Sequence, residues 1–218
     1  MQTTLARWKK RCLLLLERYR TSHGDVLRRK IIAVQYLFLD VDRDTGAFRR
    51  SLAFSCPVGC GVCCQNPHVQ ASELELLPLA SQLDRLRQAE GFYEKADKQD
   101  FQGRCIFFFP EAGSSGQGKC LQYASRPLIC RLFGFSGNRD RHGHFRLASC
   151  SVLKDKILPL AAPGIQKPEG TEDKPVFMSD YVLRLSSIDP DLSREMLPIN
   201  MAFKRAVDRI WLHKKFAH

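Results

Sequence analysis

Hydrophobic side chains near the start of the chain recur at every third or fourth position, which is the spacing of one helix face. The pattern predicts a first helix that Thr3 or Thr4 would cap and that Gly24 would end. It also predicts a second helix beginning at Asp25. The buried face of that second helix would carry Leu27, Ile31, Val34 and Phe38.

A strand is the competing interpretation for part of this second segment. Residues 33–41 are dense in β-branched and aromatic side chains, and residues 42–46 have the composition of a turn. Asp40, Asp42 and Asp44 alternate as in a calcium-binding loop. Gly46 is one position too late for such a loop, and Ser51 stands where its bidentate glutamate should be, so the sequence argues against a calcium site.

The middle of the chain predicts short helices and short strands. Ser72 and Glu75 form a capping box that begins a helix, and Pro78 would interrupt this helix before its apolar stripe ends at Gly91. Residues 127–133 predict a helical turn that Gly134 would stop. Short strands are expected over residues 105–109, 119–123 and 144–147.

Two helices are expected near the end of the chain, at Ser179–Ile188 and from Pro198 onward. One face of the last helix would carry Ile199, Phe203, Val207, Ile210 and Trp211. The fold class we predict is α+β, with a small irregular cysteine-cluster domain, short strands, and flanking helical segments. Its parts are a basic helical segment (1–50), a cysteine-cluster metal-binding domain (51–158), a Pro/Gly-rich linker or loop (159–178) and a C-terminal helical segment (179–218).

The charge of the chain is concentrated at its two ends. The 218 residues carry a formal net charge of +11, with a balance of +7 in residues 1–50, +4 in residues 198–218 and zero between them. Basic ends of this kind could bind an anionic partner such as nucleic acid, or an anionic membrane surface. No apolar stretch is long enough to span a bilayer, and the N-terminus lacks the features of a secretory signal. We therefore expect a cytoplasmic location.

Nine cysteines in a reducing compartment indicate metal or redox chemistry rather than a disulfide framework. Four of them stand within nine residues: Cys56, Cys60, Cys63 and Cys64. The spacing of Cys60 and Cys63 lets two thiolates from one turn hold a single ion, and Gly61 frees the backbone between them. The adjacent pair of Cys63 and Cys64 would serve two centres, or one centre and a structural role.

Four further cysteines follow at wider spacing, namely Cys105, Cys120, Cys130 and Cys150. The resulting eight thiols could hold two four-thiolate centres, or one with spares, whereas Cys12 falls on the apolar face of the first helix and is expected in the core. Basic residues adjoin the later thiols, where they would lower thiol pKa values and offset thiolate charge. These are Arg104, Lys119, Arg126 and Arg131. Arg126 and Arg131 are the candidate cofactor-binding residues, for a cluster or an anionic substrate.

Soft thiolates select zinc or iron–sulfur clusters over calcium or magnesium. A Cys60–Cys63 dithiol switch and a set of simply buried cysteines are the alternatives. His68 is a possible further ligand or a surface residue, and His142 and His144 are expected to face solvent.

The cysteine pattern resembles the YkgJ-type cysteine-cluster family. The resemblance rests on Cys56-x3-Cys60-x2-Cys63-Cys64, then Cys105, then Cys120-x2-Tyr123-x2-Arg126-Pro127-x2-Cys130-Arg131, and covers about residues 56–150. It implies that the motif cysteines, and less firmly Cys150, are metal ligands. Members of the family are described as zinc- or iron-chelating, and often as iron–sulfur proteins. One related branch is the flagellin lysine N-methylases, which are longer chains, and no cosubstrate-binding glycine loop is evident in this sequence.

The sequence thus leads us to expect a metal-binding protein with a cysteine-ligated iron–sulfur cluster, of the 4Fe-4S type, or alternatively with zinc. Its role would be redox chemistry, metal handling or support of an enzyme reaction, with a protein partner or substrate that the sequence does not identify. The other two hypotheses are a zinc-stapled nucleic-acid-binding module, with Lys204, Arg205, Lys214 and Lys215 as contacts, and a lysine N-methylase-like enzyme.

Overall fold

A computed structural model describes residues 26–51, 60–99, 103–111, 117–148 and 175–216. The predicted first helix, residues 159–174 of the expected linker, and Cys12, Cys56 and Cys150 lie outside the described residues. The elements follow in this order: α2 (Val26–Ser51), α3 (Val62–Gln65), β1 (Gln70–Ala71), α4 (Glu73–Arg85), α5 (Ala89–Lys98), β2 (Phe108–Pro110), β3 (Gly118–Cys120), a 3-10 turn (Tyr123–Ser125), α6 (Leu128–Leu132), β4 (Gly137–Arg139), β5 (Phe145–Leu147), α8 (Met178–Ile188), α9 (Pro190–Arg194), β6 (Leu197–Pro198) and α10 (Ile199–Phe216).

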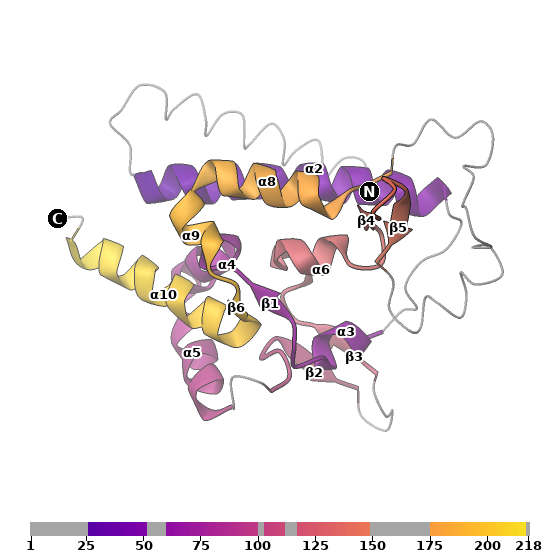
Figure 1. Cartoon of the computed structure of the whole chain (residues 1–218). Helices are drawn as coiled ribbons and strands as arrows, with labels where there is room; N and C mark the ends of the chain where they lie inside the picture. The colour runs from indigo at the N-terminus through magenta and orange to yellow at the C-terminus, as the bar shows by residue number, and fades with distance from the viewer. Residues whose placement is uncertain (1–25, 52–59, 100–102, 112–116, 149–174, 217–218) are drawn as a thin grey trace, which may run out of the picture.

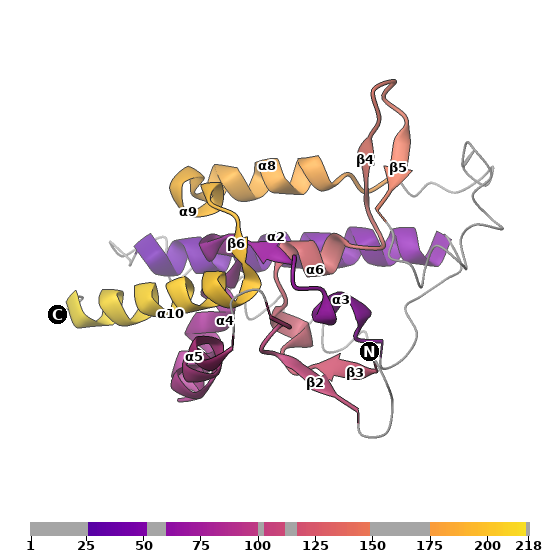
Figure 2. The same ribbon diagram turned by 60° about the horizontal axis from the view of Figure 1, so that its bottom comes forward.

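Helices make up most of this architecture, and short antiparallel strand pairs join them, which confirms the α+β class. The long helix α2 packs against α8, α4 and α6, while α10 packs against α4 and α5 (Figure 1). The strands form three separate two-stranded sheets, β1 with β6, β2 with β3, and β4 with β5. The β4–β5 hairpin stands away from the helices in the view of Figure 2.

One continuous hydrophobic core links the N-terminal, central and C-terminal parts of the described chain. Its largest fully buried side chains come from α2, α4, α6 and α10 and from the turn before β2: Val34, Val41, Leu74, Leu76, Leu77, Leu79, Leu83, Ile106, Leu132, Phe203 and Val207. The predicted apolar face of α10 is confirmed, since Ile199, Phe203, Val207 and Ile210 are buried and Trp211 is partly buried. None of the helices in the described residues has the length and apolarity to cross a membrane.

The competing strand over residues 33–41 and the turn over 42–46 are both wrong, because α2 is continuous from Val26 to Ser51. The helical face that begins at Leu27 continues through Val41 to Phe48, so tertiary burial outweighs the local preference for strand and turn. The aspartates at the calcium-like spacing lie on this helix and bind distant residues instead. Asp40 accepts from Arg184, Asp42 from Arg131, and Asp44 from Tyr181.

The capping box of α4 is confirmed: the Ser72 hydroxyl accepts from the Glu75 backbone N–H, and the Glu75 carboxylate accepts from the Ser72 N–H at 2.9 Å. The expected interruption at Pro78 is wrong, because α4 continues through it to Arg85. A proline inside a helix costs one backbone hydrogen bond, which the burial of eight of the 13 residues of α4 offsets. Gly91 ends no helix either, since it lies inside α5.

The strands are shorter than the sequence predicted. Cys105–Phe107 form a turn in which the Phe108 N–H donates to the Cys105 carbonyl at 3.0 Å, so β2 begins only at Phe108. β3 ends at Cys120, and the chain turns there toward the 3-10 turn. The predicted helical turn at 127–133 and the strand at 144–147 are found as α6 and β5, and Gly134 follows α6 with a φ of 87°.

Candidate metal centre

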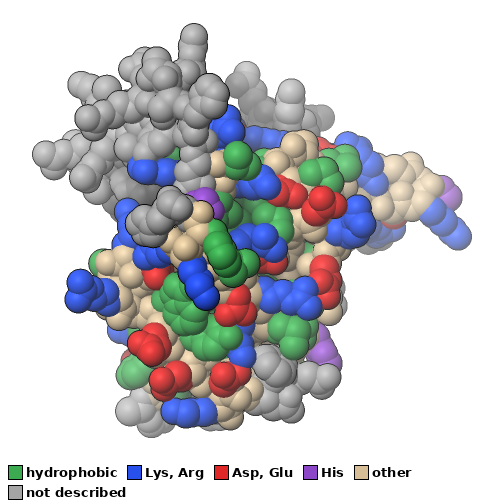
Figure 3. Space-filling view, turned by 90° about the vertical axis from the view of Figure 1, so that its left-hand side faces the viewer, with side chains coloured by type: hydrophobic (Ala, Val, Ile, Leu, Met, Phe, Trp, Pro, Cys, Tyr) green, Lys and Arg blue, Asp and Glu red, His purple; other side chains and the backbone are tan. Residues whose placement is uncertain are grey.

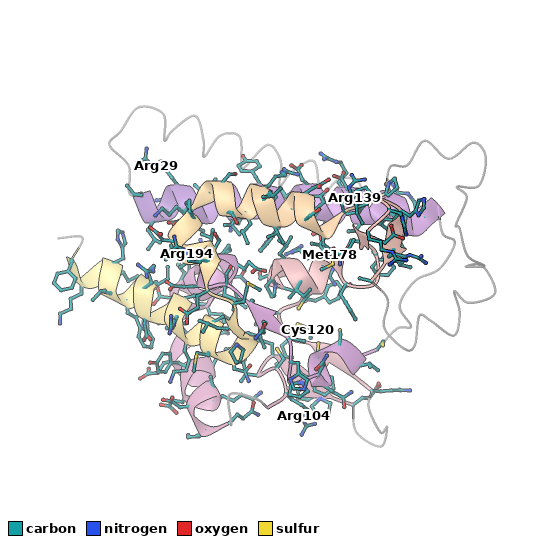
Figure 4. All side chains as sticks on the ribbon, in the orientation of Figure 1. Arg29, Arg104, Cys120, Arg139, Met178 and Arg194 are labelled. Carbon is teal, nitrogen blue, oxygen red and sulfur yellow. The ribbon has the colours of Figure 1, made fainter. Side chains whose placement is uncertain are left out.

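Six of the eight candidate cysteines lie in the described residues, and all six line one cavity of about 400 Å³. They are free thiols: Cys105 is buried, Cys63 is exposed, and the other four, Cys60, Cys64, Cys120 and Cys130, are partly buried. They come from α3 and the residues just before it, from the turn before β2, from the end of β3, and from α6. Cys120 lies below α6 in the view of Figure 4. Residues up to 70 positions apart are thus brought to one place.

Backbone hydrogen bonds fix the thiol-bearing segments relative to one another. The Cys105 N–H donates to the Cys64 carbonyl at 3.1 Å, which ties the turn before β2 to α3. The antiparallel register pairs Phe108 with Cys120, and an isolated bridge pairs Cys60 with Gln117. Three of the four segments, those that carry Cys60 to Cys64, Cys105 and Cys120, are therefore held together by the backbone itself.

Asn200, at the start of α10, holds both sides of the Cys105 turn. Its Nδ2 donates to the Arg104 carbonyl at 3.0 Å, and its Oδ1 accepts from the Ile106 N–H at 3.0 Å. The side chain is buried, and the Lys95 ammonium donates to the Ile106 carbonyl from the other side. The sequence analysis did not find Asn200, because its partners lie more than 90 residues away along the chain.

Glu75 performs a similar task for Cys130. Its Oε2 accepts from the Leu128 N–H at 2.8 Å, so the carboxylate that caps α4 also caps α6, the helix that carries Cys130. Burial raises the pKa of this carboxyl above its usual range. The expected capping role of Glu75 is confirmed, and its second contact is an addition from the structure.

Gly61 has a steric role at the entrance to α3. A Cβ on Gly61 would overlap the ring of Phe108, and a Cβ on Gly118 would overlap the same ring. The Phe108 ring thus fits between two glycine backbones, and this arrangement presses the cysteine motif against the β2–β3 pair. The glycine between Cys60 and Cys63 is required for close approach as well as for bending.

Residues 55–152 match the model of a family described as "CxxCxxCC: Putative zinc- or iron-chelating domain". These residues are called the CxxCxxCC domain after this match. The matched range includes all eight candidate ligands, among them Cys56 and Cys150 outside the described residues. Asn200 and the rest of α10 lie outside the range, so part of the scaffold of the CxxCxxCC domain comes from beyond it. Comparisons with curated proteins and with solved structures found no match.

The thiols of the CxxCxxCC domain differ widely in acidity. Cys64 lies within hydrogen-bonding reach of Cys63 and Cys120, and its thiol lowers the pKa of Cys63 to about 6 and that of Cys120 to about 7. Contact with Cys120 and Cys63 raises the pKa of Cys64 itself. Burial raises the pKa of Cys105 to about 12 and also raises that of Cys130.

The basic residues next to the thiols in the sequence explain little of this electrostatic pattern. The expectation that adjoining basic residues would lower the pKa values of the later thiols is wrong for Cys105 and Cys130, where burial dominates. Arg126 is the cation that assists at Cys63 and Cys120, across the cavity rather than next in sequence. The guanidinium of Arg126 stacks on the Tyr123 ring with its carbon 3.9 Å from the ring centre, and both residues line the thiol cavity.

Arg131 is nearly buried and its donors are directed to the protein. Its Nη1 donates to Asp42, its Nε to the Arg126 carbonyl at 2.8 Å and its Nη2 to the Ala124 carbonyl at 2.6 Å. The guanidinium also lies over the Phe38 ring, with 4.3 Å from its carbon to the ring centre. These contacts anchor the segment before α6 to α2, and they hold Arg126 in position through its carbonyl.

The histidines considered as possible ligands lie in two different places. His68 lines the thiol cavity with an exposed side chain, whereas His142 and His144 are exposed in the β4–β5 hairpin, as expected. In the described part of the chain, no three side chains of His, Cys, Asp or Glu form a closed metal site as they stand. The described thiols therefore line an open cavity and do not converge on a single point. Thiolate donors suit zinc and iron, which agrees with the described chemistry of the CxxCxxCC domain.

Proposed function

We propose that the protein holds an iron–sulfur cluster, of the 4Fe-4S type, in the cavity that the six described thiols line. The observation that carries the proposal is the convergence of Cys60, Cys63, Cys64, Cys105, Cys120 and Cys130 on one cavity. Cys56 and Cys150, from the ends of the matched domain, are proposed as additional ligands. When bound, such a cluster supplies one-electron transfer.

The number of thiols and the size of the cavity favour a cluster over a single ion. One zinc ion takes four ligands at about 2.3 Å from sulfur, so its four sulfurs would crowd around one point. Here six thiols surround about 400 Å³, and both members of the adjacent pair, Cys63 and Cys64, face this same volume. A cluster of several irons and sulfides spreads its ligands over a larger surface, and thus needs less movement of the chain.

Charge supports the same proposal. Four thiolates around an oxidised 4Fe-4S core carry an excess of negative charge, which a nearby cation stabilises. Arg126 is placed to supply that cation, since it lines the cavity and lowers the pKa values of Cys63 and Cys120. We propose redox chemistry or metal handling in a reducing compartment, the cytoplasm, as the role of this centre.

The test is anaerobic purification of the full chain, with measurement of iron, zinc and acid-labile sulfide, optical absorption, and EPR after reduction. We expect iron and sulfide in equal amounts, broad visible absorption that bleaches on reduction, and loss of both in Cys64→Ser and Cys105→Ser. The matched control is Cys12→Ala, which removes a thiol outside the CxxCxxCC domain and should keep the cluster. Stoichiometric zinc without iron or sulfide after anaerobic preparation would refute the cluster and leave a zinc centre.

The basic residues of α10 give no support to nucleic-acid binding over this proposal. Lys204, Arg205 and Lys214 pair with Asp97, Glu195 and Asp84, which come from other parts of the molecule. Figure 3 shows one face on which basic and acidic side chains are interspersed. The positive excess of the C-terminal sequence is thus largely balanced in space, and the cysteine cavity remains the stronger indication of function.

A further inference from the structure

A second cavity, of about 230 Å³, lies behind the wall that Tyr123 and Arg126 form at the thiol cavity. These two residues line both cavities. The rest of the second cavity is formed by α2 and by the segment around α6, namely by Asp42, Thr45, Gly46, Arg49, Ala124, Arg131 and Phe135. A group bound in it would lie directly beside the proposed metal centre, separated by one arginine and one tyrosine.

The second cavity carries an excess of positive charge. Three arginines line it, namely Arg49, Arg126 and Arg131, and the one acidic residue among the described residues of its lining is Asp42. Arg131 already donates to Asp42, and Arg126 reaches the same carboxylate only at 3.9 Å. One negative charge is thus shared by two cations, and a third cation stands beside them.

Two of the three guanidinium groups have donors to offer. The Nε of Arg126 is buried and finds no hydrogen-bond acceptor among the described residues. A buried donor without an acceptor destabilises the folded protein, unless a bound group accepts its hydrogen bond. Arg49 is exposed at the edge of the cavity, over the Phe135 ring, and no carboxylate of the described residues pairs with it. Arginine presents such donors in a planar fork that matches carboxylate and phosphate oxygens.

Gly46 keeps the α2 side of this cavity open. A glycine inside a helix is unfavourable relative to alanine, so it usually has a packing reason. No such packing reason is found at Gly46 among the residues that the structure describes, because a Cβ there would meet only the Arg50 guanidinium, at 3.8 Å. The missing side chain leaves space along the helix surface, in the cavity that Arg49 and Arg126 also line.

We propose that this second cavity binds the carboxylate or phosphate group of a small anionic molecule, next to the thiol cavity. Arg49 and Arg126 are its ligands for the oxyanion, Arg131 and Asp42 hold the wall in place, and Gly46 supplies the room. The proposal stands on the guanidinium groups and the cavity, and it does not depend on which metal the thiols hold.

The test uses the full chain with its metal and follows the midpoint of thermal unfolding as inorganic phosphate or succinate is added. Sodium chloride keeps the ionic strength constant. We expect a saturating rise in the wild type, and an affinity about tenfold weaker or worse in Arg49→Gln, since each charge-assisted contact contributes about that factor. Gly46→Leu should abolish the saturation without lowering the midpoint of the ligand-free protein, because leucine is a better helix former and fills the cavity.

The matched control is Arg29→Gln, which removes the same charge from an exposed position at the other end of α2 (Figure 4) and should bind like the wild type. Saturation with phosphate alone would identify a phosphate ligand, and saturation with succinate alone a carboxylate ligand. If neither anion saturates, or if all variants respond as the wild type does, the anions only screen the net positive charge and the proposal is overturned.

Discussion

Replacing Asn200 by alanine removes both hydrogen bonds that hold the Cys105 turn to α10. The Ile106 N–H and the Arg104 carbonyl then lose their partners, at 3.0 Å each in the native protein. Because Asn200 and Ile106 are buried, water cannot simply replace the lost contact at the Ile106 N–H. Cys105, which lies between the two clamped peptide groups, would lose its fixed position at the thiol cavity.

A buried polar group left without its partner costs about 1–3 kcal/mol. Asn200→Ala leaves the buried Ile106 N–H without its acceptor, whereas the carbonyl of the exposed Arg104 can bind water. We therefore expect a loss of about 2 kcal/mol in the free energy of unfolding, a substantial part of the ~5–15 kcal/mol that holds a typical protein. The measurement is urea unfolding of the reduced, metal-free full chain, so that the stability of the scaffold is read without the metal. Metal content after anaerobic purification is the second readout, and it should fall in the same variant.

The matched control is Asn138→Ala, since Asn138 is exposed on β4. Surface substitutions of this kind change stability by less than about 0.5 kcal/mol. If Asn200→Ala lost less than about 1 kcal/mol and kept its metal, the two hydrogen bonds would not be what positions Cys105, and the argument for a scaffold outside the CxxCxxCC domain would fail.

Two further predictions concern the thiols and the entrance to α3. In metal-free protein at neutral pH, iodoacetamide should modify Cys63, whose pKa is about 6, long before Cys105, whose pKa is about 12. As the pH is raised, the rate of modification at Cys63 should level off above its pKa, while the rate at Cys105 keeps rising. Site-resolved mass spectrometry measures both rates, and equal rates would contradict the prediction. Gly61→Ala should lower the free energy of unfolding by about 1–3 kcal/mol, because its Cβ overlaps the Phe108 ring. Gly91→Ala, with open space around it inside α5, should instead raise stability by about 0.5–1 kcal/mol, and equal effects of the two alanines would contradict the steric argument.

Local sequence patterns predicted the helices whose apolar face is regular and whose ends are capped. The capping box at Ser72 and the apolar stripe from Ile199 to Ile210 are of this kind, since both depend on contacts a few residues apart. The predicted turn over residues 42–46 was wrong because the composition of this segment is that of a turn. The partners that hold it in α2, Arg131 and Tyr181, lie about 90 residues or more away along the chain. No local window contains that information.

The cysteine motif predicted the candidate metal ligands, and the structure brings the six described thiols to one cavity. The residues that make this possible carry no comparable pattern. Asn200 is a single asparagine in an amphipathic helix, so nothing in its sequence context indicates its two hydrogen bonds. Phe108 has the sequence context of an ordinary core residue, and only the structure shows that its ring lies against two glycines. Ligand identity can be inferred from side-chain chemistry and spacing, but the scaffold that orients the ligands depends on tertiary contacts.

The position of Asn200 near the end of the chain also sets an order of events during synthesis. The cysteine motif at residues 60–64 leaves the ribosome long before Asn200 and the helix that carries it. Until α10 has been made and has docked on α4, the Cys105 turn lacks its clamp and the thiol cavity lacks one wall, which Ile199 supplies. The early chain therefore presents reactive cysteines without a complete cavity. We expect the proposed metal to be inserted stably only after α10 is complete, and a chain that stops before it to remain empty.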